Sequence, residues 1–411
     1  MRKNIILLLT ILTCSLYVVQ AQTLEDYFQL AAENNPGLQA KYKSFETALE
    51  RIPQASALPD PTFSFGYFIS PVETRVGPQR ARFSLTQMFP WFGTLKSKGD
   101  AAALLAEAKY QAFLDSRNQL YYQVAAAYYP LYELEQWTAL EQENIEILES
   151  YKTISTKQFE NGNGAMVDVL RVDIMLKDAS TNLQILTKKR EPLVATFNAL
   201  INRDEAEEVI VEDTLTIETL LNDYRRDSLL TDNPILNELE LKLKASEEME
   251  QVAIKQGLPK FGVGLDYAIV GNRSGVELPD NGQDILMPMV SMSIPIFRKK
   301  YNAAIKEAQL SQKSYQLQRE DYSNRLVASY ESMAFELEKE RQLIELYNQQ
   351  ISESQQALNL LYTAYSNSGK EFEEVLRMQQ QLLKYEKMKA TAITRYHTAL
   401  AKLNYITAKK Y

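Results

Sequence analysis

The feature that most constrains the fold is the length of chain near the C-terminus that lacks both glycine and proline. Neither residue type occurs between Pro295 and Gly369, and neither recurs from there to Tyr411. Within the first stretch, apolar residues alternate at spacings of three and four, which is the heptad pattern of a helix that packs along a seam. Apart from polar interruptions at Glu340 and Ser354, the seam consists of Leu326, Tyr330, Met333, Leu337, Ile344, Tyr347, Ile351, Leu358, Leu361 and Tyr365.

The first half of the chain has a seam of the same kind. It consists of Leu120, Val124, Ala127, Leu131, Leu134, Ile145 and Leu148, and Pro130 inside it predicts a kink. A helix of about 70 residues is about 100 Å long at 1.5 Å per residue, which is longer than a compact domain. We therefore expect the two long helices to project as a coiled-coil or barrel-like shaft.

Several short segments recur about 200 residues apart and in the same order. Asn35-Pro36 recurs as Asn233-Pro234, and Val169-Leu170-Arg171 recurs as Val375-Leu376-Arg377. This spacing is too long for a solenoid repeat and indicates two similar halves within one architecture. The sequence predicts a first repeat over residues 22–201, a connector over 202–231 and a second repeat over 232–411.

Each half is predicted to contain a helix, two strands, a very long helix and a shorter helix. The first helix is expected to run from Thr23 to about Ala57, where two prolines follow. Period-two alternation predicts the strands. The expected strands are at about 61–70, 79–89, 259–270 and 285–294; the long helices are at about 94–160 and 298–366, and the shorter helices are at about 165–201 and 371–409. The fold class is mainly α with a small β part.

The first residues have the pattern of a secretory signal peptide. Arg2 and Lys3 precede an apolar run, and small residues at Val19 and Ala21 predict cleavage after residue 21. The only cysteine, Cys14, would be removed with this leader, so neither a disulfide nor a Cys–His zinc site is expected. The net charge of −8 disfavours nucleic acid as the partner.

Each predicted strand has one apolar face and one face of small or polar residues. In an exported chain, the apolar face can be buried in a soluble sandwich or in lipid, and the strands alone fit both. Four strands leave two open edges, which are not viable in hydrocarbon, so a membrane sheet must close. Because a barrel needs about eight strands or more, several chains must contribute. Three chains give twelve strands and a water-filled lumen, and the long helices favour this alternative.

With these elements the chain resembles the TolC-like outer-membrane efflux proteins of Gram-negative bacteria. The resemblance lies in residues 24–36, 59–67, 89–93 and 164–171 and their counterparts in the second half. It implies a homotrimer with a twelve-stranded barrel in outer-membrane lipid and a twelve-helix tunnel in the periplasm. It also implies a periplasmic adaptor protein and an inner-membrane transporter as partners, so that the chain is an exit duct for small molecules or ions.

Such a duct needs an entrance and a docking surface where the long helices reverse. The carboxylates near the two reversals are candidates for charged rings, a known means of ion selection: Asp168, Glu371, Glu373 and Glu374. In the family, acidic residues at this end of the second hairpin narrow the entrance. The alternative is that they are favourable charges at helix N-termini.

The turns at the two reversals are the candidate docking surface for the adaptor, although they are also explained as ordinary exposed turns. The residues of these turns are Asn161, Gly162, Asn163, Gly164, Asn367, Ser368 and Gly369. Aromatic residues expected at the membrane interface are Phe89, Trp91 and Phe92.

We expect no catalytic residue, cofactor or metal site. Met287, Met289 and Met292 are explained by strand packing rather than by copper binding, and His397 by packing in the last helix. The alternatives are an exported coiled-coil scaffold or adhesin, a carboxylate hydrolase and, within the channel interpretation, a duct for heavy-metal cations or for type I secretion.

Overall fold

The computed structural model describes residues 23–217, 230–275, 277, 279–368 and 372–409, so the predicted leader lies outside the described residues. The chain divides into two compact units. A helical unit comprises Met1–Gln39, Ser116–Leu230 and Leu326–Tyr411, and a sheet unit comprises Ala40–Asp115 and Thr231–Arg325. Each unit therefore draws on both halves of the sequence.

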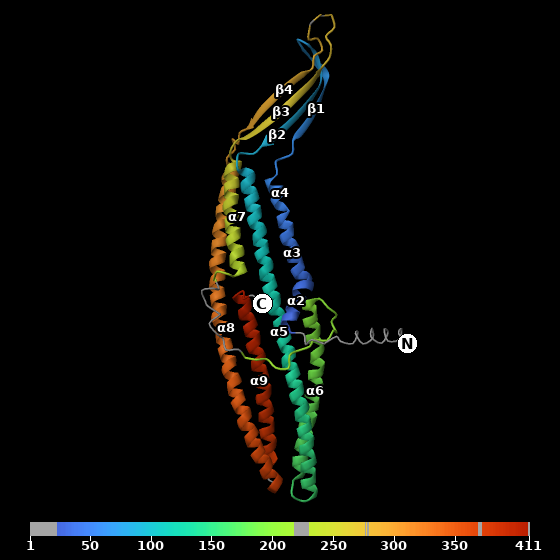
Figure 1. The fold of residues 1–411 in the computed structure, drawn as a ribbon, viewed down its shortest axis with the longest axis vertical. Helices are drawn as coiled ribbons and strands as arrows, with labels where there is room; N and C mark the ends of the chain where they lie inside the picture. The colour runs from blue at the N-terminus through green and yellow to red at the C-terminus, as the bar shows by residue number, and fades with distance from the viewer. Residues whose placement is uncertain (1–22, 218–229, 276, 278, 369–371, 410–411) are drawn as a thin grey trace, which may run out of the picture. The chain divides into compact units, whose positions relative to one another are not determined.

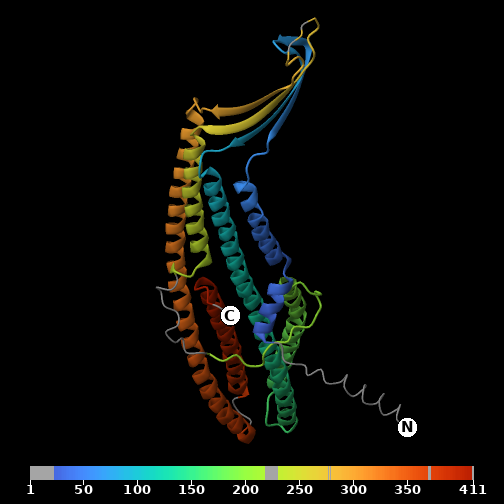
Figure 2. The same ribbon diagram turned by 45° about the horizontal axis from the view of Figure 1, so that its top comes forward.

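The sheet unit is built on four antiparallel strands in the order β1-β2-β3-β4 (Figure 1). The strands are β1 (Thr62–Thr74), β2 (Gly77–Phe89), β3 (Lys260–Val270) and β4 (Ile285–Ser293). The hairpin of the second half pairs directly with the hairpin of the first, with Leu85 opposite Leu265. Figure 2 shows the four strands side by side in one curved sheet. Within the described residues of this chain, β1 and β4 each have a neighbour on one side only, so the sheet is open at both edges.

The two faces of this sheet differ in the way the alternation predicted. Large apolar side chains of one face are exposed: Phe63 is 65% exposed, Tyr67 69% and Val290 82%. On the other face the buried carboxylate of Asp266 accepts a hydrogen bond of 2.5 Å from the Ser84 hydroxyl and forms an ion pair with Arg82. Among the described residues nothing covers these apolar side chains, whereas the charges of Asp266 and Arg82 on the opposite face are paired between adjacent strands.

The helices that enter and leave the strands depart from the prediction at one place. The single helix expected from Thr23 to Ala57 is instead α2 (Leu24–Asn34), α3 (Pro36–Leu49) and α4 (Arg51–Ser56). The first break lies at Asn35, whose ψ of 117° is extended. This is the conformation that a following proline favours, because its ring disfavours helical geometry in the residue before it. The predicted helix start is confirmed, since Thr23 and Asp26 form a reciprocal capping box.

The Asn-Pro pair begins a helix in both halves. The Asn233 side chain accepts hydrogen bonds from the N–H groups of Ile235 and Leu236, and Pro234 is the first residue of α7 (Pro234–Gln256). The Asn35 side chain accepts a hydrogen bond from the N–H of Leu38 in α3. Asparagine satisfies N–H groups that a helix start leaves unpaired, and proline supplies the required φ without losing a hydrogen bond. The recurring dipeptide therefore has one local role in both places.

The helical unit contains α6 (Met166–Ile201), α9 (Phe372–Ile406) and the larger parts of α5 (Thr94–Glu160) and α8 (Lys299–Ser368). The predicted seams are its core. On α8, Leu337 and Tyr365 are at most 1% exposed, and on α5 Val124 and Leu148 are fully buried. Among the described residues, no helix combines the length and the apolar character needed to cross a bilayer.

Candidate functional site

The two reversals of the helical unit lie where α5 passes into α6 and where α8 passes toward α9. The first reversal is a compact turn in which the Asn163 N–H donates to the Gln158 carbonyl over 2.8 Å. Gly162 has a φ of 72°, a backbone conformation that favours glycine. Asn161, Gly162 and Asn163 are exposed and Gly164 is partly buried. At the second reversal Asn367 is exposed and Ser368 ends α8, whereas Gly369 lies outside the described residues.

Behind these reversals the helices are joined by stacked aromatic rings. The Tyr365 and Phe372 rings stack with centroids 4.5 Å apart, and Tyr151 meets Phe372 edge-on at 6.1 Å. The Tyr365 hydroxyl has no hydrogen-bond partner in the described part of the chain. Burial raises the pKa of this hydroxyl, and the nearby Asp168 carboxylate raises it further. The rings fix the start of α9 against the ends of α5 and α8.

One arginine links the candidate gate residues of the two reversals. The Arg171 guanidinium on α6 lies 2.9 Å from a Glu373 carboxylate oxygen on α9 and 3.8 Å from a carboxylate oxygen of Asp168 on its own helix. The Arg171 and Glu373 side chains are 40% and 68% exposed, so water and salt weaken their attraction. The contact nevertheless joins the first turn of α9 to α6.

The other carboxylates in this region also have basic partners. Glu374 pairs with Arg377 within α9, and Asp173 on α6 lies 2.6 Å from the ammonium of Lys152 on α5. Glu371 lies outside the described residues. Of the described candidate carboxylates, Glu373 and Glu374 each have an arginine partner, and Asp168 shares Arg171 with Glu373 at the longer distance of 3.8 Å.

These basic partners were not predicted from the sequence, although part of the signal was present there. Asp168 with Arg171, and Glu374 with Arg377, have the three-residue spacing at which opposite charges meet on a helix. The link from Arg171 to Glu373 crosses between helices about 200 residues apart in sequence. No local pattern encodes that contact.

The predicted interface aromatics lie in the sheet unit at the end of β2. Phe89 is the last residue of the strand and is 40% exposed, and Phe92 is 81% exposed. Trp91 contacts Phe92 and also Phe261 of β3, with ring centroids about 6 Å apart in both pairs. The three aromatics thus gather at one end of the sheet.

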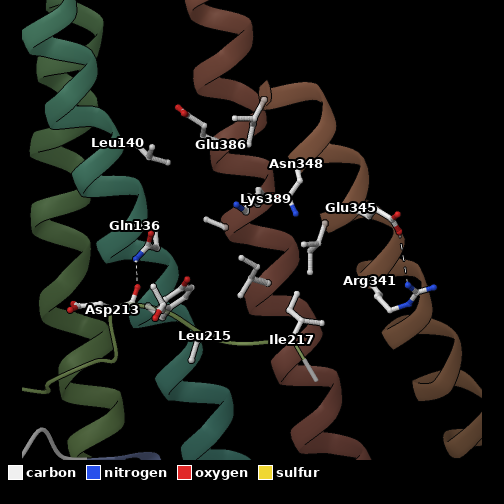
Figure 3. Close-up of a pocket in the computed structure, with 16 residues that line it drawn as sticks. Gln136, Leu140, Asp213, Leu215, Ile217, Arg341, Glu345, Asn348, Glu386 and Lys389 are labelled. Atoms are coloured by element: carbon white, nitrogen blue, oxygen red, sulfur yellow. Dashed lines mark hydrogen bonds and ion pairs between the residues drawn. The ribbon is translucent and has the colours of Figure 1, made fainter. Parts of the chain in front are cut away.

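A cavity of about 670 Å³ opens in the helical unit between α5, α8, α9 and residues 213–217 of the connector (Figure 3). Isoleucine and leucine side chains form much of its wall, while Arg341 and Glu345 lie on the α8 side. The Gln136 amide donates to the Asp213 carbonyl over 3.1 Å and ties the connector to α5. Glu386 and Leu140 lie at one end of the cavity.

Among the described residues, no three His, Cys, Asp or Glu side chains are grouped as a metal site. Met287 and Met289 lie opposite Asp266 and Gly264 on one sheet face, and Met292 lies opposite Phe261 on the other. His397 is 8% exposed, and its ring lies 5.3 Å from that of Tyr129. Burial lowers the pKa of His397 to about 4.

An open amphipathic sheet and very long helices are the fold elements that this chain shares with several solved outer-membrane channels. The fold matches the solved outer-membrane channel OprN with a TM-score of 0.78 at 16% identity, covering 94% of this chain and 90% of that one. It matches the MtrE outer-membrane channel of Neisseria gonorrhoeae with a TM-score of 0.76 at 17% identity, covering 94% and 89%. It also matches the outer-membrane protein VceC of Vibrio cholerae with a TM-score of 0.74 at 15% identity, covering 93% of this chain and 95% of that one.

The sequence model of the outer membrane efflux protein family matches residues 226–409, which is the second predicted repeat with the end of the connector. A comparison with curated protein sequences finds no significant match. The resemblance to the TolC-like outer-membrane efflux proteins is thereby confirmed, by the family model over the second half and by the fold over nearly the whole chain.

Proposed function

We propose that this chain is the outer-membrane exit duct of a tripartite efflux system and that it carries small molecules or ions passively to the cell exterior. The observation that carries the proposal is the sheet itself, whose apolar face is uncovered and whose two edges are unpaired in the part of the chain that the structure describes. In water such a sheet exposes both its apolar face and its edges. In lipid the apolar face is favourable, provided that the edges are closed.

Closure by three copies accounts for both features. Joining β1 of one copy to β4 of the next makes a twelve-stranded barrel that has no edge, and its apolar face then contacts outer-membrane lipid. The face that carries Asp266, Arg82 and Ser84 then lines the lumen. Phe89, Trp91 and Phe92 lie at one rim, where aromatic side chains favour the boundary between lipid and water. The helical unit extends into the periplasm.

The reversals at the end of the helical unit form the periplasmic entrance in this proposal. The ion pair between Arg171 and Glu373 ties α9 to α6, and its opening frees both groups. Glu373 then adds an unpaired carboxylate to the entrance beside the other proposed gate residues, Glu371, Glu374 and Asp168, and carboxylates there attract cations. The exposed turn at Asn161–Gly164 and the end of α8 at Asn367 and Ser368, followed by Gly369, are the proposed docking surface for a periplasmic adaptor that connects to an inner-membrane transporter.

Conductance measurement tests this function. Protein extracted from the outer membrane and added to planar lipid bilayers is expected to give discrete current steps with a preference for cations. The double change Glu373→Gln and Glu374→Gln is expected to lower that preference, while Glu353→Gln, a change at an exposed residue within α8, leaves it unaltered. Protein that is folded yet gives no current at any concentration contradicts the proposal.

A further inference from the structure

The helical unit contains a second cavity, separate from the reversals and from the sheet. Its volume is about 290 Å³, and it lies between α5, α8 and α9. It adjoins the larger cavity of Figure 3, since Leu140 and Glu386 line both. The proposed export function assigns no role to it.

The charge of this cavity is unbalanced. Of the side chains that line it, all from the described part of the chain, only Glu143 on α5 and Glu386 on α9 are charged. Burial raises the pKa of Glu386, and the proximity of Glu143 raises it further, while Lys389 opposes the rise. Lys389 lines the larger cavity and not this one. The half-buried Glu386 and the exposed Glu143 thus line one cavity that has no basic lining residue, an arrangement that a bound cation stabilises.

A neutral acceptor in the same wall also lacks a partner. Gln379 on α9 is 3% exposed, lines the cavity, and its side-chain oxygen has no hydrogen-bond partner in the described part of the chain. A buried polar atom without a partner costs free energy, which a donor from a ligand would recover. A ligand that donates to Gln379 would also lie beside the two carboxylates that line the same cavity.

The remaining lining distinguishes between kinds of cation. Tyr151 and Tyr362 stack with ring centroids 5.8 Å apart, leucine and isoleucine side chains form the apolar part of the wall, and the uncharged polar side chains of Asn144, Ser150, Gln355 and Asn359 complete it. The described residues include no group of three side chains suited to direct coordination of a metal, and no His, Cys or Met lines this cavity. An ammonium group donates N–H bonds to oxygen acceptors, and its carbon chain favours aromatic and aliphatic contacts. We infer that this cavity binds a small organic ammonium compound of the alkyl diamine type, with its charge at Glu143 and Glu386.

Isothermal titration of the purified full-length mature protein with putrescine near pH 7 tests the inference, and it does not depend on conductance. We expect saturable binding of one putrescine per chain and none of 1,4-butanediol, which has a similar length but no charge. Glu143→Gln and Glu386→Gln keep the side-chain volume and should each weaken binding by roughly tenfold or more, because each removes one charged acceptor. Glu149→Gln, a change at an exposed residue of α5 that does not line the cavity, should leave the affinity unchanged.

Three results would overturn the inference. One is the absence of saturable putrescine binding to the unaltered protein, which decides the matter even if a variant fails to fold. Another is an equal loss of affinity in Glu149→Gln. The third is binding of Mg²⁺ that is tighter than that of putrescine and is lost in the same two variants, which would assign the cavity to a hydrated metal ion.

Discussion

The ion pair between Arg171 and Glu373 gives the sharpest prediction about the proposed entrance. Arg171→Gln breaks the contact that joins α6 to α9 while leaving the aromatic stack of Tyr365 and Phe372 in place. Because both charged side chains are well exposed, the contact is worth about 0.2–1 kcal/mol per chain. If three copies open together, the change favours the open entrance by about 0.6–3 kcal/mol, or about 3- to 150-fold in the ratio of open to closed channels.

The matched control is Arg377→Gln. It also removes one positive charge near the reversal, but its partner Glu374 lies on the same helix, so no link between helices is lost. Single-channel recording should show a higher open probability for Arg171→Gln than for Arg377→Gln, and the difference should shrink at high salt as the native pair is screened. Equal open probabilities in the two variants would show that charge alone, and not the link between α6 and α9, sets the entrance.

Two further predictions concern stability. Because burial lowers the pKa of His397 from 6.5 to about 4, the unfolded chain binds a proton before the folded one does. Acidification from pH 6.5 to 4 should therefore cost up to about 3 kcal/mol of unfolding free energy at this residue. The melting temperature should depend less steeply on pH in His397→Gln than in the unaltered protein, because carboxylates elsewhere affect both proteins alike. If the two curves of melting temperature against pH are parallel, His397 is not the group responsible. Separately, Lys387→Met strands the buried carboxylate of Glu141 and should destabilise the protein by about 3–5 kcal/mol, whereas adding Glu141→Gln should restore most of the melting temperature. If the melting temperature of the double variant stays as low as that of Lys387→Met, this explanation is wrong.

The features that could be predicted from sequence are those with a strong local period. The heptad seam on α8 was predicted from residues such as Leu337, Ile344 and Leu358, and all three are buried. The strands were predicted because apolar residues alternate with small or polar residues along them, which places the apolar side chains on one face of the sheet. The predicted bounds lie within four residues of the strands and long helices observed, because glycine, proline and asparagine mark the ends of these elements.

The first helix was wrongly expected to continue through Asn35, although the proline that follows is a local signal for a break.

Features that depend on contacts between distant segments were not predicted. The partners of Glu373 and Glu141 lie on other helices, and nothing in the local sequence identifies Arg171 or Lys387 as the residue opposite. The cavity at Glu143 and Glu386 likewise exists only once three helices pack. Sequence periodicity determines which face a residue occupies but not what lies opposite.

Closure of the sheet by neighbouring copies is tested most directly by disulfide trapping. The only cysteine is Cys14 in the predicted leader, so the mature chain offers a cysteine-free background. Ser64 on β1 and Ser291 on β4 are exposed on the same sheet face, at opposite edges. With Ser64→Cys and Ser291→Cys together, and with Gly66 and Met289 as alternative positions that allow for a shifted register, oxidation in outer membranes should yield covalent dimers and trimers with the trimer as the largest species. If oxidation yields only monomer for every cysteine pair, although the protein is folded and present in the membrane, closure by neighbouring copies is contradicted.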